Sequence, residues 1–194
     1  MNARTRRTEL VENFSETLIY ERIGHYLYST LLGLHLDGEM KFREKLNYLN
    51  GLHGDSVHKF NQLLGCQLHD TLEPQKSAQI LRVLFRTQIP YEMFYCLHEA
   101  VVEATEELSK HYQKPKSSFD AQALVPYLIL VLIKALQLQQ KSEHADQDDF
   151  MKVNLSKQHT QGIKVRFLLM EHFTVHALGM HRQDYSFVSF KEVE

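Results

Sequence analysis

The sequence predicts an all-α protein, a single layered helical domain around a central buried helix at about Ala123–Ala135. Between Ala123 and Ile133, ten of eleven residues are aliphatic or aromatic and none is charged. Elsewhere, apolar residues recur every three or four positions, which is the spacing of amphipathic helices, and no alternating strand pattern competes with it. The 194 residues are 43% hydrophobic, which is enough for one core, so we expect residues 1–194 to form one domain.

Pro126 favours a helix over a strand for the central segment. Its missing N–H does no harm in the first turn of a helix, and Ser118 or Asp120 upstream can cap that turn. An interior strand would lose a ladder hydrogen bond at Pro126. The apolar run is shorter than the roughly 20 residues needed to cross a bilayer. We therefore expect a buried helix and no integral membrane segment.

Five amphipathic helices are expected before the central one. Glycines, prolines and capping residues set their bounds. The first runs from Thr8 to about Gly33 and ends before Asp37-Gly38; the second carries Phe42, Leu46 and Leu49 and stops at Gly51 and Gly54; the third follows the cap Asp55 and ends at Gly65; the fourth begins at Pro74; the fifth begins at Pro90.

A polar insertion or loop is expected at about residues 137–162, where apolar residues are few and scattered. An apolar helix resumes over Ile163–Leu178. Near the end of the chain, Ser189 and Glu192 have the spacing of a capping box, which marks the start of a helix. We therefore expect a terminal helix to be cut short, as in a truncated form or a short isoform.

Composition excludes several classes of function. A net charge of −2 and a pI near 6.6 give no electrostatic field for nucleic acid or anionic membranes. Cys66 and Cys96 are too few for a disulfide framework, and the first residues carry no signal peptide. We therefore expect a cytoplasmic protein that reaches a membrane only through a partner.

No motif for covalent catalysis or cofactor binding is visible. Glycine-rich phosphate loops, nucleophile elbows and paired zinc-binding cysteines are missing from the sequence. His172 and His176 are four residues apart, but Glu171 precedes them rather than lying between them, so we expect no metal. Asp146, Asp148 and Asp149 lack the glycine and glutamate of a calcium loop. The sequence favours a binding or regulatory module without a cofactor.

Several passages, in order, resemble the Vps-nine (vacuolar protein sorting nine) domain, the helical exchange module for Rab-five-type GTPases. They are Leu18–Leu49, similar to the family's opening helices; Ile89–Leu97, similar to its proline-led helix; Ala121–Pro126 with the aliphatic run after it, similar to Ala-Asp-Asp-Leu-Leu-Pro; Lys164–Phe173; and Asp184-Tyr185, which falls on Gly-Tyr. The resemblance implies guanine nucleotide exchange on a Rab-five-subfamily GTPase in endosomal vesicle trafficking.

The resemblance also assigns the candidate site. Gln122 stands where the family has an aspartate, four residues before the helix proline, Pro126. That aspartate competes with Mg²⁺ and phosphate for a lysine of the GTPase, and neutral Gln122 lacks its charge. Tyr185 is retained, and Val188 replaces a threonine. We expect Asp120 to point to a different helix face from Gln122 and to need a local rearrangement to replace the family aspartate.

Three hypotheses remain open at this point. The chain is a weak exchange factor that is cytoplasmic and peripheral on endosomes, a Vps-nine-like scaffold that binds without catalysing exchange, or an unrelated helical adaptor. The neutral Gln122 favours the scaffold, and the matched order of helices with Pro126 and Tyr185 favours the exchange factor.

Overall fold

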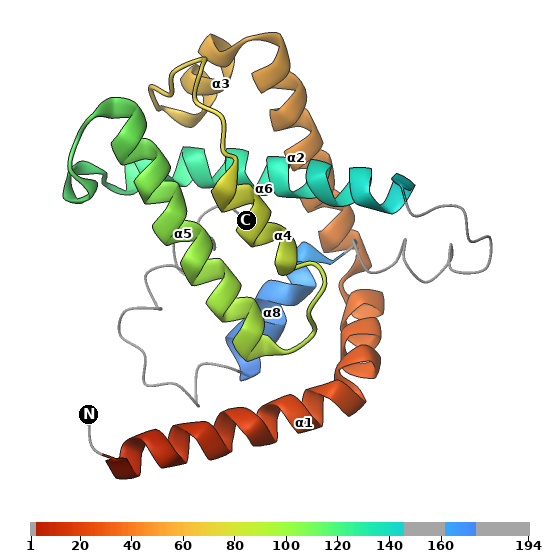
Figure 1. Ribbon diagram of the computed structural model, residues 1–194. Helices are drawn as coiled ribbons and strands as arrows, with labels where there is room; N and C mark the ends of the chain where they lie inside the picture. Colours follow the sequence, from red (N-terminus) through yellow and green to blue (C-terminus); the bar gives the residue numbers. More distant parts are fainter. Residues whose placement is uncertain (1–2, 146–161, 174–194) are drawn as a thin grey trace.

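Seven α-helices and one short 3-10 helix make up residues 3–145 and 162–173, the part of the chain that the computed structural model describes (Figure 1). Their bounds are α1 Ala3–Leu34, α2 Leu36–Asp55, α3 Val57–Leu64, α4 Lys76–Val83, α5 Pro90–Tyr112, η1 Lys116–Ser118, α6 Ala121–Ala145 and α8 Ile163–Phe173. These ranges contain no strand. The prediction of an all-α protein is confirmed.

Helix α6 is the central buried helix. It packs against α4, α5 and α2, and it passes behind α4 and α5 in Figure 1. The side chains from Tyr127 to Ile133 are all buried, with Tyr127, Leu128, Val131 and Leu132 fully enclosed. The apolar segment that was predicted to form the centre of the core therefore lies there.

Helix α6 is longer than predicted at both ends. It continues to Ala145, so residues 137–145 of the expected polar loop are helical. Leu138 packs against the core and Gln139 is buried, and the Gln, Lys, Glu and Ala residues of this stretch favour a helix. The rest of the expected loop, 146–161, lies outside the described residues.

The longer α6 also bears on the membrane prediction. Its stretch Gln122–Lys141 has 20 residues and a mean hydropathy of 1.5, so by length and composition it could cross a bilayer. In the structure, 61% of that stretch is buried. Burial of this kind is also what the core helix of a soluble protein shows.

The helix ends predicted from glycines, prolines and capping residues were confirmed at some positions and wrong at others. Gly65 ends α3 in the left-handed conformation with φ of 64°, and Pro90 is the first residue of α5, as predicted. Helix α2 instead begins at Leu36 and passes through its glycines, and Ser56, not Asp55, caps α3 by accepting from the Lys59 N–H at 3.4 Å. Pro74 lies two residues before α4, which begins at Lys76.

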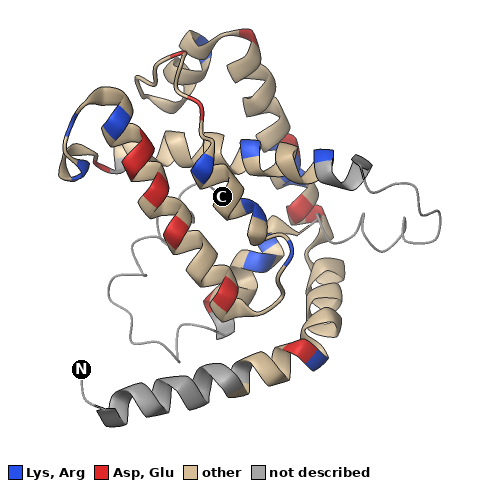
Figure 2. Ribbon diagram, viewed as in Figure 1, with Lys and Arg blue, Asp and Glu red and all other residues tan. Residues whose placement is uncertain are grey.

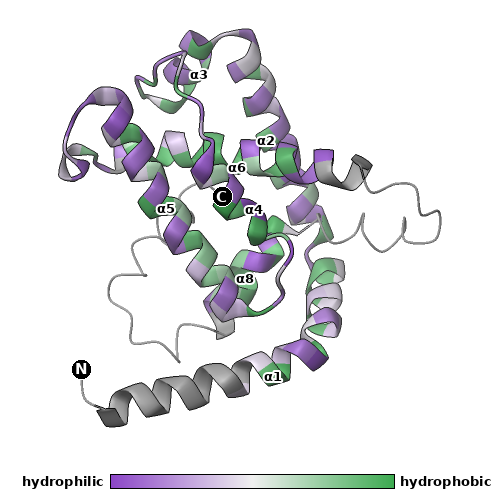
Figure 3. Ribbon diagram, in the orientation of Figure 1, coloured by the Kyte–Doolittle hydropathy of each residue, from purple (hydrophilic) through white to green (hydrophobic). Residues whose placement is uncertain are grey.

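Several apolar residues at the helical spacing expected for α1 are exposed, and the buried residues of α1 include two tyrosines outside that spacing. Tyr20 and Tyr28 are buried, whereas Ile19, Ile23 and Tyr26 are about half exposed or more. Figure 3 shows hydrophobic residues on the helices around α6 and also along the described part of α1.

Glu107 on α5 joins three helices. Its Oε1 accepts hydrogen bonds from the backbone N–H groups at the start of α4, at 3.1 Å from Gln75, 2.8 Å from Lys76 and 3.4 Å from Ser77. Its Oε2 accepts from the Ser77 hydroxyl and, at 3.0 Å, from the Tyr127 hydroxyl on α6. A carboxylate at a helix N-terminus satisfies free N–H groups and is favoured by the helix dipole. Glu107 therefore fixes α4 and α6 relative to α5.

Arg166 on α8 caps the other end of α4. Its Nε donates to the Leu84 carbonyl at 2.9 Å and its Nη2 donates to the Phe85 carbonyl at 2.8 Å. These two residues form the turn that follows directly after α4. Its Nη1 donates to the Tyr28 hydroxyl of α1 at 2.7 Å, and the guanidinium lies 4.6 Å from the Tyr28 ring centroid. Burial lowers the pKa of Arg166 from its usual value, and the hydrogen bond to Tyr28 acts against that shift.

Glu39, near the start of α2, caps α8 in the same way. Only 1% exposed, it accepts from the N–H groups of Gly162 at 2.9 Å, Ile163 at 3.0 Å and Lys164 at 2.9 Å. Gly162 has a φ of +114°, and a Cβ there would collide with the Tyr28 hydroxyl, so this position requires glycine. The sequence showed neither Glu39 nor Arg166 as a buried residue.

We predict that Glu107→Ala lowers the unfolding free energy by about 3 kcal/mol, because it leaves two hydroxyls and three N–H groups without their acceptor. Urea unfolding followed by circular dichroism measures this. The matched control is Glu106→Ala on the same helix, which removes only a surface ion pair to Lys116 at 3.2 Å and should change stability much less. An equal loss in the two variants would contradict the structural role of Glu107.

Stability should also fall above about pH 10. Burial, then the charge of Glu107, raise the pKa of the Tyr127 hydroxyl above its usual value. The unfolded chain releases the Tyr127 proton near pH 10, while the folded chain keeps it, so the contribution of Tyr127 is complete below that pH and is lost above it. Tyr127→Phe should reduce this alkaline slope, measured by urea unfolding between pH 9 and 11. Tyr48→Phe, at a 63% exposed position, should leave it unchanged.

Candidate functional site at the start of helix α6

Asp120 is the N-cap of α6. Its Oδ1 accepts a hydrogen bond from the Ala123 N–H at 3.1 Å, and its backbone carbonyl accepts from Leu124 N–H at 3.0 Å. The predicted cap is therefore Asp120, whereas the other candidate, Ser118, donates its hydroxyl to the Pro115 carbonyl at 2.6 Å. The Asp120 carboxylate is exposed and lies at the positive end of the longest buried helix.

Gln122 is exposed on the first turn of the same helix. Pro126 lies inside α6 rather than in its first turn, as its sixth residue, and it is buried. Because proline has no N–H, it cannot donate the usual hydrogen bond to the Gln122 carbonyl four residues earlier. Pro126 therefore shapes the site through the backbone of Gln122 and not through a surface of its own.

Asp120 and Gln122 line one pocket of about 400 Å³. The pocket is bounded by the start of α6, by Tyr112 at the end of α5, by Lys114 in the segment that follows, and by the loop of residues 65–68. Both residues border this pocket, and the expectation that their side chains point to different helix faces stays a prediction.

Hydrogen bonds hold the loop wall of this pocket. Asn61 on α3 donates to the Leu68 carbonyl at 2.7 Å and accepts from the Leu68 N–H at 3.1 Å and the Cys66 thiol at 3.2 Å. The Tyr112 hydroxyl donates to the Gln67 carbonyl at 3.2 Å and accepts from the His69 N–H at 3.1 Å. These bonds fix the loop of residues 65–68 relative to α3 and α5.

The electrostatics at the pocket are mixed. Lys114 and Asp120 line it together, and Figure 2 shows acidic residues along α5 with basic residues at its end. Burial raises the pKa of the Cys66 thiol at the pocket wall. Burial and then the charge of Glu92 raise the pKa of the Cys96 thiol on α5. Neither thiol is activated as a nucleophile.

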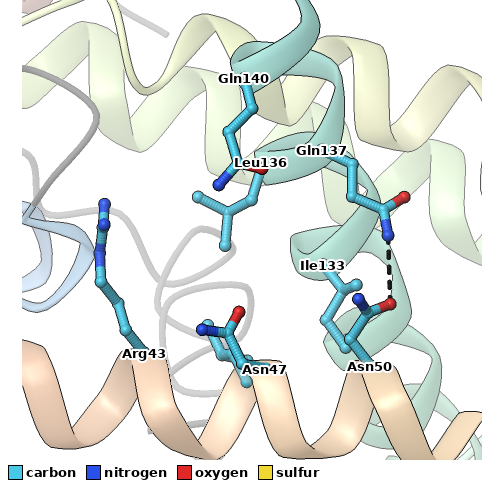
Figure 4. Close-up of a pocket in the computed structure, with 8 residues that line it drawn as sticks. Arg43, Asn47, Asn50, Ile133, Leu136, Gln137 and Gln140 are labelled. Carbon is cyan, nitrogen blue, oxygen red and sulfur yellow. Dashed lines mark hydrogen bonds between the residues drawn. The ribbon is translucent and has the colours of Figure 1, made fainter. Parts of the chain in front are cut away.

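A second, smaller pocket lies between α2 and α6 (Figure 4). It measures about 100 Å³ and is lined by Arg43, Asn47 and Gln140 among others. Gln137 donates to the Asn50 Oδ1 at 3.1 Å across one side of it. Arg43 also lies 3.6 Å from the Glu39 carboxylate. None of the described candidate site residues, Asp120, Gln122 and Pro126, lines this pocket.

The remaining candidate residues are placed as follows. Tyr185 and Val188 lie outside the described residues, as do Asp146, Asp148, Asp149 and His176. Within residues 3–145 and 162–173, no group of three or more His, Cys, Asp or Glu side chains could hold a metal ion. The candidate site in the described part of the chain therefore rests on Asp120, Gln122 and the pocket beside them.

The pocket walls were not found from the sequence. Tyr112 and Phe119 flank the Lys114-Pro115 linker and could have been noted as aromatic residues beside a turn. Their partner loop at residues 65–68 lies about 45 positions earlier in the chain, as the Tyr112–Gln67 hydrogen bond shows. Periodicity and capping rules carry no information on such a distant pairing.

No protein-family model, curated protein or solved structure matches the chain. The comparisons therefore neither support nor oppose the resemblance to the Vps-nine domain, and it stays a prediction.

Proposed function

We propose that the chain binds a small GTPase of the Rab-five subfamily through the start of α6 and weakly promotes release of GDP. The observation that carries the proposal is that Asp120 and Gln122 are both exposed beside one preformed pocket at the N-terminus of the central helix. The resemblance of Ala121–Pro126 and of the helix order to exchange factors supplies the class of partner.

The chemistry that the proposal requires is a negative charge beside the phosphates of the nucleotide. A carboxylate there pairs with the lysine that holds the phosphates and repels the phosphate charge, so nucleotide retention becomes less favourable. Gln122 can hydrogen-bond to that lysine but carries no charge. Asp120 supplies the charge two residues earlier. Its Oδ1 caps α6, and a carboxylate has further lone pairs with which to accept from a lysine.

A second function, binding without exchange, is favoured by the neutral side chain of Gln122. In this case the chain is a cytoplasmic scaffold, peripheral on endosomes, that holds the GTPase and leaves its nucleotide in place. Both functions require binding to the GTPase. They differ in whether the charge at positions 120 and 122 changes the rate of GDP release.

We predict that Gln122→Asp raises the rate of GDP release about tenfold or more, since about 1.4 kcal/mol of transition-state stabilisation corresponds to a factor of ten. The rate is measured with Rab-five-subfamily GTPases loaded with fluorescent GDP. Gln122→Asn, which is neutral and equally polar, serves as the matched control and should not raise it. If no GTPase of the subfamily releases GDP faster with the native chain or with Gln122→Asp, the exchange function is wrong.

Asp120→Asn tests where the native charge comes from. Asparagine caps a helix as well as aspartate does, so this variant removes the charge and keeps the cap. We expect the native exchange rate to fall severalfold while the melting temperature changes little. If the Asp120→Asn variant keeps the native exchange rate, Asp120 does not supply the charge and the proposed mechanism fails.

A further inference from the structure

The second pocket, between α2 and α6, is lined mainly by polar side chains. Its nearly buried apolar residues are Leu46 and Ile133. The polar residues that line it are Arg43, Asn47, Asn50, Gln137 and Gln140. Polar groups between two packed helices need hydrogen-bond partners, which come from each other, from water or from a ligand. The partners of these side chains therefore indicate what the pocket can hold.

Two of these side chains satisfy each other. Gln137 donates to the Asn50 Oδ1 at 3.1 Å across one side of the pocket. In Figure 4, Arg43 and Asn47 project from α2, and Gln140 projects from α6, toward the remaining space. An amide offers an NH₂ group with N–H donors, and a guanidinium offers donors only. Donors from two helices therefore border the same space.

Arg43 is the only charged residue that lines this pocket. Its side chain is 30% exposed, and its Nε lies 3.6 Å from the Glu39 Oε1. The Glu39 carboxylate accepts hydrogen bonds from the N–H groups at the start of α8, which offset its negative charge. A guanidinium has several N–H donors in a planar fork, so an ion pair at Nε does not use them all. The pocket therefore favours an anion.

The size of the pocket limits the anion to a small one. The volume is about 100 Å³. Pockets for drug-sized ligands and cofactors measure roughly 300–1,000 Å³, so a whole nucleotide does not fit. A single oxyanion does, and a tetrahedral one offers oxygens to donors that approach from both helices.

From the charge, the donors and the size together, we propose that the pocket between α2 and α6 binds one phosphate group, with Arg43 pairing to it bidentately and the Asn47 and Gln140 amides donating to its other oxygens. Arginine matches phosphate in this geometry, and the charge makes each hydrogen bond stronger than a neutral one. The group is either free inorganic phosphate or the phosphate end of a small molecule that extends out of the pocket. This inference does not rest on the proposed function.

Inorganic phosphate, added to the native chain near neutral pH and at constant ionic strength, tests the inference. By nuclear magnetic resonance we expect saturable shifts of the side-chain amide signals of Asn47 and Gln140, with a dissociation constant on the order of millimolar. Potassium chloride at the same ionic strength should not shift these signals. If phosphate causes no saturable shift at either residue, the inference is wrong.

Gln140→Glu places a carboxylate in the pocket and keeps the shape of the side chain. Glutamate and glutamine are similar helix formers and Gln140 is exposed, so the melting temperature should change little. Because like charges repel, we expect phosphate to bind this variant roughly tenfold more weakly. The matched control is Gln79→Glu, at an exposed position of α4 outside the pocket, which changes the net charge equally and should leave binding unchanged.

Arg43→Lys tests the role of the guanidinium. Lysine keeps a positive charge beside Glu39, so we expect the fold to be kept, but its ammonium cannot pair bidentately with phosphate. Binding should therefore be severalfold weaker. Native affinity for phosphate in Gln140→Glu or in Arg43→Lys would overturn the inference.

Two further compounds identify the group that binds. Tighter binding of inorganic phosphate than of glycerol phosphate assigns the pocket to the free ion. Binding of glycerol phosphate that is at least as tight assigns the pocket to the phosphate end of a larger molecule, and either result supports the inference. Acetate has fewer oxygens and should bind more weakly than both. Acetate that binds as tightly as inorganic phosphate would overturn the assignment to phosphate.

Discussion

The described structure depends on charged side chains that cap the ends of helices belonging to other parts of the chain. Glu107 of α5 caps the start of α4, Arg166 of α8 caps its end, and Glu39 of α2 caps the start of α8. Helix termini have backbone groups without internal partners, and burying them requires partners from elsewhere. The eight-residue α4 could not be buried among longer helices without them.

These caps connect the helix ends to the candidate site. The Tyr127 hydroxyl donates to Glu107, so the same carboxylate that caps α4 also holds α6, the helix that Asp120 caps. At the other side of the pocket, Tyr112 and Asn61 hold the loop of residues 65–68. Hydrogen bonds on two sides therefore hold the backbone around the exposed side chains at the start of α6. A binding site held in this way needs little conformational change to bind a partner.

The sequence predicted what depends on local pattern. The all-α class, the buried helix around Leu128 and the helix end at Gly65 follow from periodicity and from one or two residues, and Asp120 was one of two candidate caps, with Ser118. The sequence-based prediction was wrong where contacts between distant residues determine the structure. Helix α6 continues past Lys134 because Leu138 packs against the core. On α1, Ile23 is exposed to solvent although its spacing is that of a buried face. Glu39, Glu107 and Arg166 look like surface residues in the sequence, because nothing local shows which helix ends they meet.

Native-state hydrogen exchange tests the capping account most directly. The N–H groups of Ser77, Gly162 and Ile163 bond to carboxylates of other helices instead of backbone carbonyls of their own. We expect these amides, at the starts of α4 and α8, to exchange slowly, close to the rate set by unfolding of the core. The internal comparison is the first turn of α5, whose N-cap Ile89 makes no side-chain cap and which should exchange faster. Equally fast exchange at Ser77, Gly162, Ile163 and the start of α5 would contradict it.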